Sequence, residues 1–149
     1  MDFKEKRVII TGASSGIGLA LAREFARWGA RVVMGARSGE KLETLAREID
    51  PTGERTAWTV TDVTREEECR RLVELAAERF GGVDILICNA GISMRALFEE
   101  VDLSVLHRLM DVNFWGTVHC AKYALPYLLR TRGSIVGVSS VAGIHGLPG

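Results

Sequence analysis

The chain has 149 residues, of which 47% are hydrophobic and 26% are charged, a composition typical of one soluble globular domain. Nineteen basic and nineteen acidic side chains cancel, which argues against nucleic acid or an anionic membrane as a partner. The three cysteines, Cys69, Cys88 and Cys120, form no Cys-x-x-Cys pair, which argues against a zinc site or a disulfide framework.

The amino-terminal segment and the hydropathy pattern predict a cytoplasmic protein. Residues 1–7, MDFKEKR, are charged and lead directly into an apolar run, which is unlike a secretory signal peptide. No apolar stretch of the sequence is long enough to span a bilayer. We therefore expect the cysteines to be small buried residues in a reducing compartment.

The first predicted strand leads through a glycine-rich turn into the first predicted helix. The strand, Arg7–Thr11, is an apolar β-branched run of the kind that is buried on both faces of a sheet. Apolar residues then recur at helical spacing over Ile17–Trp28, and Gly29 is suited to end that helix.

The turn between this strand and helix predicts an anion site. It has the pattern Gly-x-x-x-Gly-x-Gly, formed by Gly12, Gly16 and Gly18. A helix N-terminus carries unpaired N–H groups and a partial positive charge, and small residues let a pyrophosphate approach them. Ser14 and Ser15 can add hydroxyl donors. The alternative is a tight strand–helix turn that binds no ligand.

The second predicted strand, Ala30–Arg37, ends where a dinucleotide-binding fold meets the adenosine ribose. A carboxylate at that point binds the ribose 2′-hydroxyl, whereas an arginine accommodates a 2′-phosphate. Arg37 and Ser38 stand here, and the next acidic residue is Glu40. Because a guanidinium matches a phosphate bidentately, the sequence favours NADP over NAD. The alternative is that Arg37 is a solvated arginine at a strand end.

Two helices and a strand are predicted next. Gly39–Asp50 is an amphipathic helix, and Thr56–Val60 is the third strand. Thr64, with Glu67 three residues later, is a capping-box pattern that predicts the start of a helix running to Phe80.

The remaining elements complete an alternation of strands and helices. Val83–Gly91 is the fourth strand with its turn, Leu103–Leu129 is a long helix, Gly133–Ser140 is the fifth strand and Val141–Gly149 is a loop. Five strands separated by four helical segments predict repeated βα units and a parallel sheet with helices on both faces. The chain, residues 1–149, is therefore predicted to be one α/β domain.

Four motifs together resemble those of the short-chain dehydrogenase/reductase family. They are TGASSGIG at Thr11–Gly18, NAG at Asn89–Gly91, DVNFWG at Asp111–Gly116 and GSIVGVSSVAG at Gly133–Gly143. The resemblance covers residues 6–149. It implies a Rossmann-like doubly wound sheet with strand order 3-2-1-4-5, and hydride transfer between a nicotinamide cofactor and a carbonyl compound or secondary alcohol. It also implies a homodimer or homotetramer.

The resemblance implies a set of cofactor-binding residues. Asp62 matches the family aspartate that contacts the adenine amino group, although it could also be a loop aspartate near the next helix. Ser15 stands where NADP-binding members often have a basic residue, which departs from that pattern. The implied set is Gly12, Ser14, Ser15, Gly16, Ile17, Gly18, Arg37, Ser38, Asp62, Val63, Asn89, Ala90 and Gly91.

The resemblance also implies two catalytic residues. Ser140 stands three residues before Gly143 and matches the serine that binds the substrate oxygen. Asn113 matches the asparagine that holds a water in the proton relay, although a mid-helix amide could simply bond locally. No metal site is expected, because no carboxylate or cysteine shares a spacing with His107, His119 or His145.

The family's catalytic tyrosine and lysine are expected beyond this sequence. The tyrosine would come thirteen residues after Ser140, four places past Gly149, and the lysine four residues later. We therefore expect a truncated form that lacks the carboxyl-terminal part of the fold and is inactive alone. A cofactor-binding module without catalysis is the alternative, and a methyltransferase is a less suitable one.

Overall fold

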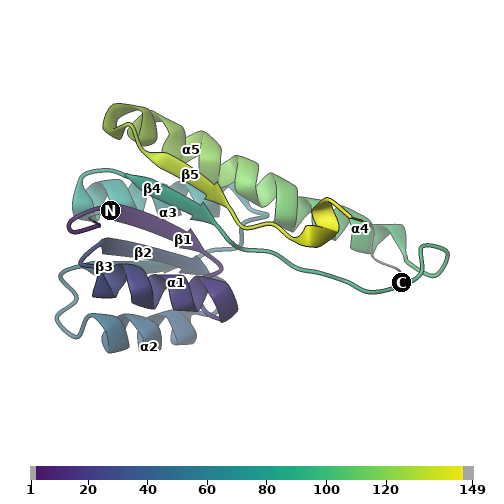
Figure 1. Ribbon diagram of the computed structural model, residues 1–149, viewed down its shortest axis with the longest axis horizontal. Coiled ribbons are helices and arrows are strands. Elements are labelled where there is room, and N and C mark those ends of the chain that lie inside the picture. The colour runs from purple at the N-terminus through teal and green to yellow at the C-terminus, as the bar shows by residue number, and fades with distance from the viewer. Residues whose placement is uncertain (1–2, 146–149) are drawn as a thin grey trace.

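The computed structural model describes residues 3–145, and five parallel strands form its central sheet (Figure 1). The strands are β1 Arg7–Thr11, β2 Arg31–Ala36, β3 Thr56–Val60, β4 Ile85–Cys88 and β5 Ser134–Gly137. They lie in the order β3-β2-β1-β4-β5, and neighbouring strands are parallel. The predicted α/β class and strand order are therefore confirmed, although β2, β4 and β5 are shorter than the runs from which they were predicted.

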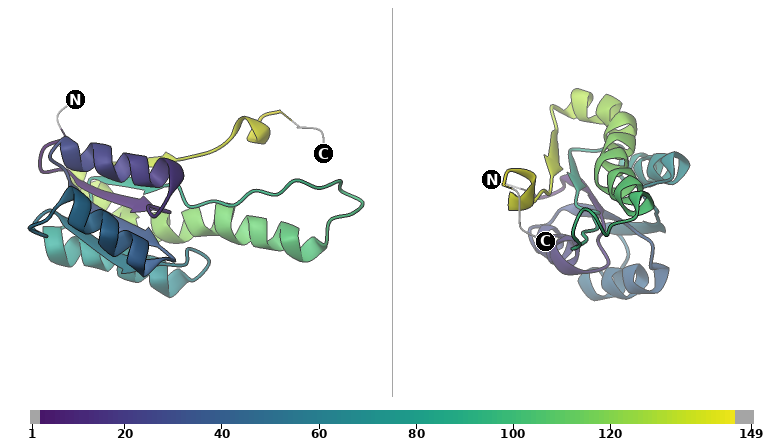
Figure 2. Two further views of the ribbon diagram at one scale, coloured as in Figure 1. Left: turned by 90° about the horizontal axis from the view of Figure 1, so that it is seen from below. Right: turned by 90° about the vertical axis from the view of Figure 1, so that its right-hand side faces the viewer.

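Helices cover both faces of this sheet (Figures 1 and 2). One face packs against α1, Gly16–Arg27, and α2, Gly39–Ile49; the other packs against α3, Glu66–Phe80, and α5, Gly116–Thr131. In β1, Val8 and Ile10 belong to the first layer, whereas Ile9 belongs to the second. Because successive side chains of a strand point to opposite faces, a continuous apolar run is what a doubly covered strand requires.

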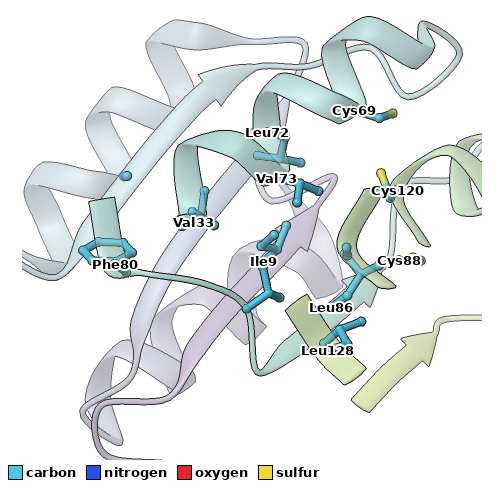
Figure 3. Packing of buried hydrophobic residues seen from close by; sticks show 14 of the residues in the cluster. Ile9, Val33, Cys69, Leu72, Val73, Phe80, Leu86, Cys88, Cys120 and Leu128 are labelled. Atoms are coloured by element: carbon cyan, nitrogen blue, oxygen red, sulfur yellow. The ribbon is translucent and has the colours of Figure 1, made fainter. Parts of the chain in front are cut away.

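The layer under α3 and α5 contains the three cysteines (Figure 3). Cys69, Cys88 and Cys120 come from α3, β4 and α5, are at most 5% exposed and form no disulfide. Burial raises the pKa of the Cys88 thiol to about 11, so this group stays neutral at physiological pH. The cysteines are buried core residues, as expected.

The predicted capping box of Thr64 and Glu67 is wrong. Helix α3 begins at Glu66, and the side chain of the preceding Arg65 does not cap it. The Thr64 hydroxyl instead donates to Asp62 Oδ1 at 2.8 Å. Thr64 therefore stands one residue before the N-cap position, and its hydroxyl closes the turn that precedes the helix.

The long predicted helix is one helical segment with an irregular middle. Helix α4, Leu103–Met110, is followed by a turn of π-helix, Asp111–Trp115, and then by α5. A Cβ at Gly116 would lie 2.6 Å from Val63 Cγ2, so the start of α5 can lie this close to that segment only with glycine. Figure 2 shows that α4 and the segment before it project beyond the sheet.

The carboxyl-terminal region has less structure than the rest. The four residues of β5 are all exposed at the edge of the sheet. The region predicted as a loop, Val141–Gly149, begins with a 3₁₀ turn at Val141–Gly143, and its residues 146–149 lie outside the described residues. Between residues 3 and 145, no helix is both long enough and apolar enough to cross a membrane.

Asp84 joins the amino-terminal ends of three neighbouring strands. Its carboxylate accepts hydrogen bonds from the Arg7 backbone N–H at 2.9 Å, from Arg7 Nε at 2.6 Å and from Arg7 Nη2 at 3.0 Å. Its backbone N–H donates to the Arg7 carbonyl, and its carbonyl accepts from the Ser134 N–H, both at 2.9 Å. A Cβ at Gly133 would collide with that carbonyl oxygen. This ion pair therefore aligns β1, β4 and β5.

The substitution Asp84→Asn should lower the free energy of unfolding by about 2 kcal/mol at pH 7, because Arg7 loses its charged partner. Burial acts to raise the pKa of Asp84, but hydrogen bonds and charge from Arg7 lower it overall. A lowered folded-state pKa gives stability that is present above the unfolded-state pKa of about 3.9 and lost as pH falls through the folded-state pKa.

Urea denaturation at several pH values checks this expectation. The difference between wild type and Asp84→Asn should be largest at pH 7 and shrink below about pH 4. A difference of the same size at pH 3.5 would contradict it. Glu48→Gln is the control, because Glu48 pairs with Arg23 at a site where both side chains are 48% exposed, and no measurable change is expected.

Candidate functional site

A cleft of about 520 Å³ opens at the carboxyl ends of β1, β2 and β4. The chain leaves β1 for α1 on one face of the sheet, whereas β4 leads toward the helices of the other face. Such a point, where neighbouring connections diverge, is where open α/β sheets bind ligands. Eleven of the predicted cofactor-binding residues line the cleft: Gly12, Ser14, Ser15, Ile17, Arg37, Ser38, Asp62, Val63, Asn89, Ala90 and Gly91.

The glycine-rich turn forms one end of the cleft. Gly12 has a φ of +66° and Gly16 a φ of +53°, values in the left-handed region that favour glycine. A Cβ at Gly18 would collide with the Gly12 carbonyl oxygen and lie 2.5 Å from Asn89 Nδ2, so only glycine lets α1 start this close to the strand ends. Gly16 and Gly18 therefore shape the cleft without lining it.

The start of α1 faces the cleft with donors. The first amide groups of a helix have no carbonyl partner within the helix, and the helix dipole adds a partial positive charge there. The side chain of Ser15, which precedes the helix, does not cap it, and both Ser14 and Ser15 line the cleft. This set of donors, without a Cβ in the way at Gly12 and Gly16, suits a pyrophosphate.

A network around Thr11 fixes β1 to the segment after β4. The backbone N–H groups of Asn89 and Ala90 both donate to Thr11 Oγ1 at 3.0 Å. The Asn89 side chain donates from Nδ2 to the carbonyl oxygens of Thr11 at 3.0 Å and Gly12 at 3.3 Å. Thr11 is 2% exposed, so these bonds are protected from water. Asn89 is therefore a structural residue of the cleft as well as a lining one.

The other end of the cleft is basic. Arg37 and Ser38 follow β2 there, as predicted, and Lys41 from the first turn of α2 also lines it. Asp62 is the one carboxylate among the lining residues that the structure describes. Lys41 was not predicted from the sequence. The signal that could have identified it is its spacing, because residues three apart, such as Ser38 and Lys41, lie on the same side of a helix start.

Asp62 lies in the turn before α3 and also lines the cleft, and its contact with adenine stays a prediction. Its Oδ1 accepts hydrogen bonds from the Thr64 backbone N–H at 3.0 Å and from the Thr64 hydroxyl. Burial acts to raise the pKa of Asp62, but the bonds from Thr64 and the positive charges of Arg37 and Arg65 lower it overall. Asp62 is therefore a charged acceptor at neutral pH.

Asn113 lies in the π-helical turn and binds the segment that follows β4. Its Oδ1 accepts from the Ile92 N–H at 2.9 Å, and its Nδ2 donates to the Ile92 carbonyl at 2.8 Å. The side chain thus holds that segment in place, and Val112 and Ile92, but not Asn113, line the cleft. The role of Asn113 in a proton relay stays a prediction.

Ser140 lies beyond the end of β5, outside the lining of the cleft. Its Oγ accepts a hydrogen bond from the Ala142 N–H at 3.2 Å, and the residue is exposed. Two residues earlier, Val138 does line the cleft. The structure therefore brings eleven of the predicted cofactor-binding residues together in the cleft and leaves Ser140 outside it, two residues beyond Val138. Besides Lys41, the lining residues missed from the sequence are Ala36, Thr61, Ile92, Arg108, Val112 and Val138.

Neither tyrosine of the sequence lies at the cleft. Tyr123 and Tyr127 are both on α5, and the Tyr123 hydroxyl donates to Glu66 Oε1 at 2.6 Å. This bond raises the pKa of Tyr123, the opposite of what proton transfer near neutral pH requires. Within residues 3–145, no group of three or more His, Cys, Asp or Glu side chains could hold a metal ion.

Comparisons with known proteins place the chain among dehydrogenases. The family model described as short chain dehydrogenase matches residues 6–149. The 11-beta-hydroxysteroid dehydrogenase A of Sesamum indicum is 43% identical over 141 residues, which are 93% of this chain and 40% of that protein. The chain spans about 40–60% of the length of the curated relatives that it matches.

Solved structures agree with this relationship. An alcohol dehydrogenase from the archaeon Thermococcus sibiricus, complexed with 5-hydroxy-NADP, is 35% identical with a TM-score of 0.84 over 89% of this chain and 57% of its own. An NADH-dependent reductase responsible for alginate metabolism is 34% identical with a TM-score of 0.89 over 99% of this chain and 63% of its own.

The substitution Thr11→Val should lower the free energy of unfolding by about 2–3 kcal/mol, because two buried backbone N–H groups lose their acceptor while the shape is kept. Thermal and urea unfolding measure the loss. Thr59→Val is the matched control, since the Thr59 hydroxyl reaches only the neighbouring Val60 carbonyl, at 3.5 Å. Equal stability of the two variants would show that the Thr11 network does not hold β1 to β4.

Proposed function

This chain belongs to the short-chain dehydrogenase family, and we propose that its protein transfers a hydride between NADP(H) and a small carbonyl compound or secondary alcohol. The observation that carries the proposal is the cleft at the switch point of the sheet, with Ser14, Ser15 and the start of α1 at one end and two cations at the other. Because the chain spans only part of its relatives, the activity is proposed for the protein as a whole.

The residues present fit the pyrophosphate and the 2′-phosphate of the cofactor. Ser14, Ser15 and the first amides of α1 would hold the pyrophosphate. Arg37 and Lys41 would hold the 2′-phosphate, and none of the ion pairs among residues 3–145 includes either of them. Asp62 would accept a hydrogen bond from the adenine amino group.

The charge after β2 is what favours NADP over NAD. The two similar solved structures named above are described with NADP and with NADH, so the family relationship alone is compatible with both. A carboxylate after β2 would bind the 2′-hydroxyl of NAD. In this chain Arg37 and Ser38 follow β2 instead, and Lys41 of α2 adds a second positive charge. A dianionic phosphate gains from both charges, whereas a ribose hydroxyl does not.

The bound cofactor would supply or accept the hydride, and residues of this chain would orient the substrate oxygen and a water. The Ser140 oxygen accepts from the Ala142 N–H, and the O–H proton of the same hydroxyl would donate to the substrate oxygen. Asn113 holds the backbone of Ile92 at the cleft, and through that segment it would order a water of the proton relay. These roles are proposed for residues that the sequence singled out.

We propose further that the protein is a cytoplasmic homodimer or homotetramer. Exposed apolar side chains on the long helical segment support the assembly into oligomers. Phe114 is 50% exposed, Trp115 is 49% exposed and Leu129 is 70% exposed. Large apolar residues gathered on one exposed element are typical of a surface that another subunit covers.

A module that binds NADP without catalysis is the second candidate for the 149-residue chain itself. The observation that favours it is the position of both tyrosines on α5, away from the cleft. The chain should therefore bind NADPH with a saturable rise in cofactor fluorescence, competed by 2′,5′-ADP, yet oxidise no NADPH with a panel of ketones and aldehydes. Turnover by this chain would contradict the module assignment, and no binding at millimolar NADPH would contradict both.

The substitution Arg37→Ala should weaken NADPH binding about tenfold and leave NADH binding unchanged, because only NADPH carries the 2′-phosphate. Lys41→Ala should have a smaller effect in the same direction. Fluorescence titration with both cofactors measures the ratio of the dissociation constants. Arg47→Ala is the control. Arg47 lies on α2, as Lys41 does, but it is exposed and pairs with Glu43. An unchanged ratio in Arg37→Ala would refute the assignment of Arg37.

A further inference from the structure

Residues 61–65 connect β3 to α3, and the first three of them line the cleft. The first residue of the segment is fixed to the sheet, since the Thr61 N–H donates to the Ala36 carbonyl at 2.9 Å. The next residue is Asp62, and the hydrogen bonds that hold its backbone determine where its carboxylate points.

The hydrogen bonds around Asp62 are of two kinds. Its Oδ1 accepts from the backbone and the hydroxyl of Thr64, only two residues away, and its carbonyl accepts from the Arg65 N–H at 3.0 Å, so these bonds close a local turn. Its backbone N–H donates to Glu68 Oε2 at 2.7 Å. The neighbouring Val63 carbonyl is held by Cys69 Sγ of α3 and by His119 Nδ1 of α5, whereas the Glu68 bond links Asp62 itself to α3.

Glu68 is itself held firmly on α3. It is the third residue of the helix, and its side chain is 18% exposed. Its second oxygen, Oε1, lies 3.8 Å from the guanidinium groups of Arg65 and Arg71. Glu68 thus occupies the position from which a capping-box glutamate reaches back to the helix start, but it reaches three residues farther, to Asp62.

We propose that Glu68 is a positioning residue of the adenine end of the cleft, because its bond to the Asp62 N–H holds the Asp62 carboxylate in the orientation that recognises an amino group on a purine. The inference rests on the proposed function, in which Asp62 accepts a hydrogen bond from adenine. The Asp62 Oδ2 has no donor among the described residues and is the oxygen left for a ligand.

The experiment compares NADPH with its hypoxanthine analogue, which carries a carbonyl where adenine carries the amino group. Wild type should bind NADPH about tenfold more tightly, the value of one hydrogen bond to a charged group. Glu68→Ala should reduce this preference to less than about threefold, and Glu68→Gln should keep most of it, because the amide oxygen still accepts from the Asp62 N–H.

Glu67→Ala is the matched control. Glu67 is the neighbouring acidic residue of α3, its side chain is 65% exposed, and it pairs with Arg70 instead of the cleft wall. This variant should keep the full preference for adenine. Equal loss in Glu67→Ala and Glu68→Ala would assign the effect to the charge of the helix start and overturn the inference.

Hydrogen exchange of the Asp62 amide, followed by NMR without ligand, provides a second readout. The Asp62 amide should be protected in wild type and in Glu68→Gln, and it should exchange at least tenfold faster in Glu68→Ala. Unchanged exchange of the amides in the middle of α3 would show that the variant is folded. Unchanged protection in Glu68→Ala would overturn the inference.

The outcomes separate this inference from the function on which it rests. A Glu68→Ala variant that keeps the adenine preference overturns the role of Glu68 and leaves the proposed function standing. A wild-type chain that binds NADPH and its hypoxanthine analogue equally overturns the role of Asp62, and the inference with it.

Discussion

The close approach of the β1–α1 turn to the end of β4 is the constraint on which the rest of the site depends. Thr11 Oγ1 accepts hydrogen bonds from two backbone N–H groups of the segment after β4. In the other direction, the Asn89 side chain donates to the carbonyl oxygens of Thr11 and Gly12. Gly18 makes the approach possible because a side chain there would occupy the space of the Gly12 carbonyl. The cleft, the start of α1 and the direction of the chain after β4 all follow from this contact.

The same principle recurs along the cleft. Asn113 binds both backbone groups of Ile92, and Glu68 binds the backbone N–H of Asp62. Segments without regular structure are fixed in this way by side chains from helices, since they have no strand or helix neighbours to pair their own backbone groups. The cleft therefore has walls of irregular backbone that are nonetheless held at defined points, which is what recognition of a polar ligand requires.

The sequence predicted the sheet and the glycine-rich end of the cleft well, because each depends on local pattern. Strands such as Arg7–Thr11 are continuous apolar runs, and Gly12, Gly16 and Gly18 carry a spacing that few other turns need. Lys41 and Glu68 were not predicted, since their roles depend on what faces them across space. The capping box at Thr64 failed because α3 begins at Glu66, which makes Arg65 the N-cap residue and leaves Thr64 in the preceding turn with Asp62.

The π-helical turn at Asp111–Trp115 has a consequence for the tolerance of this segment to changes in length. An α-helix advances about 100° per residue, and a π turn contains one residue more than an α turn, so α4 and α5 are out of phase by about that angle. This offset lets α5 bury Cys120 and Ala124 while Arg108 of α4 faces the cleft. Deleting one residue here would rotate α4 as a whole and carry Arg108 away from the cleft, with the sheet left intact. The outer wall of the cleft thus depends on the residue count of this turn as well as on the identity of Asn113.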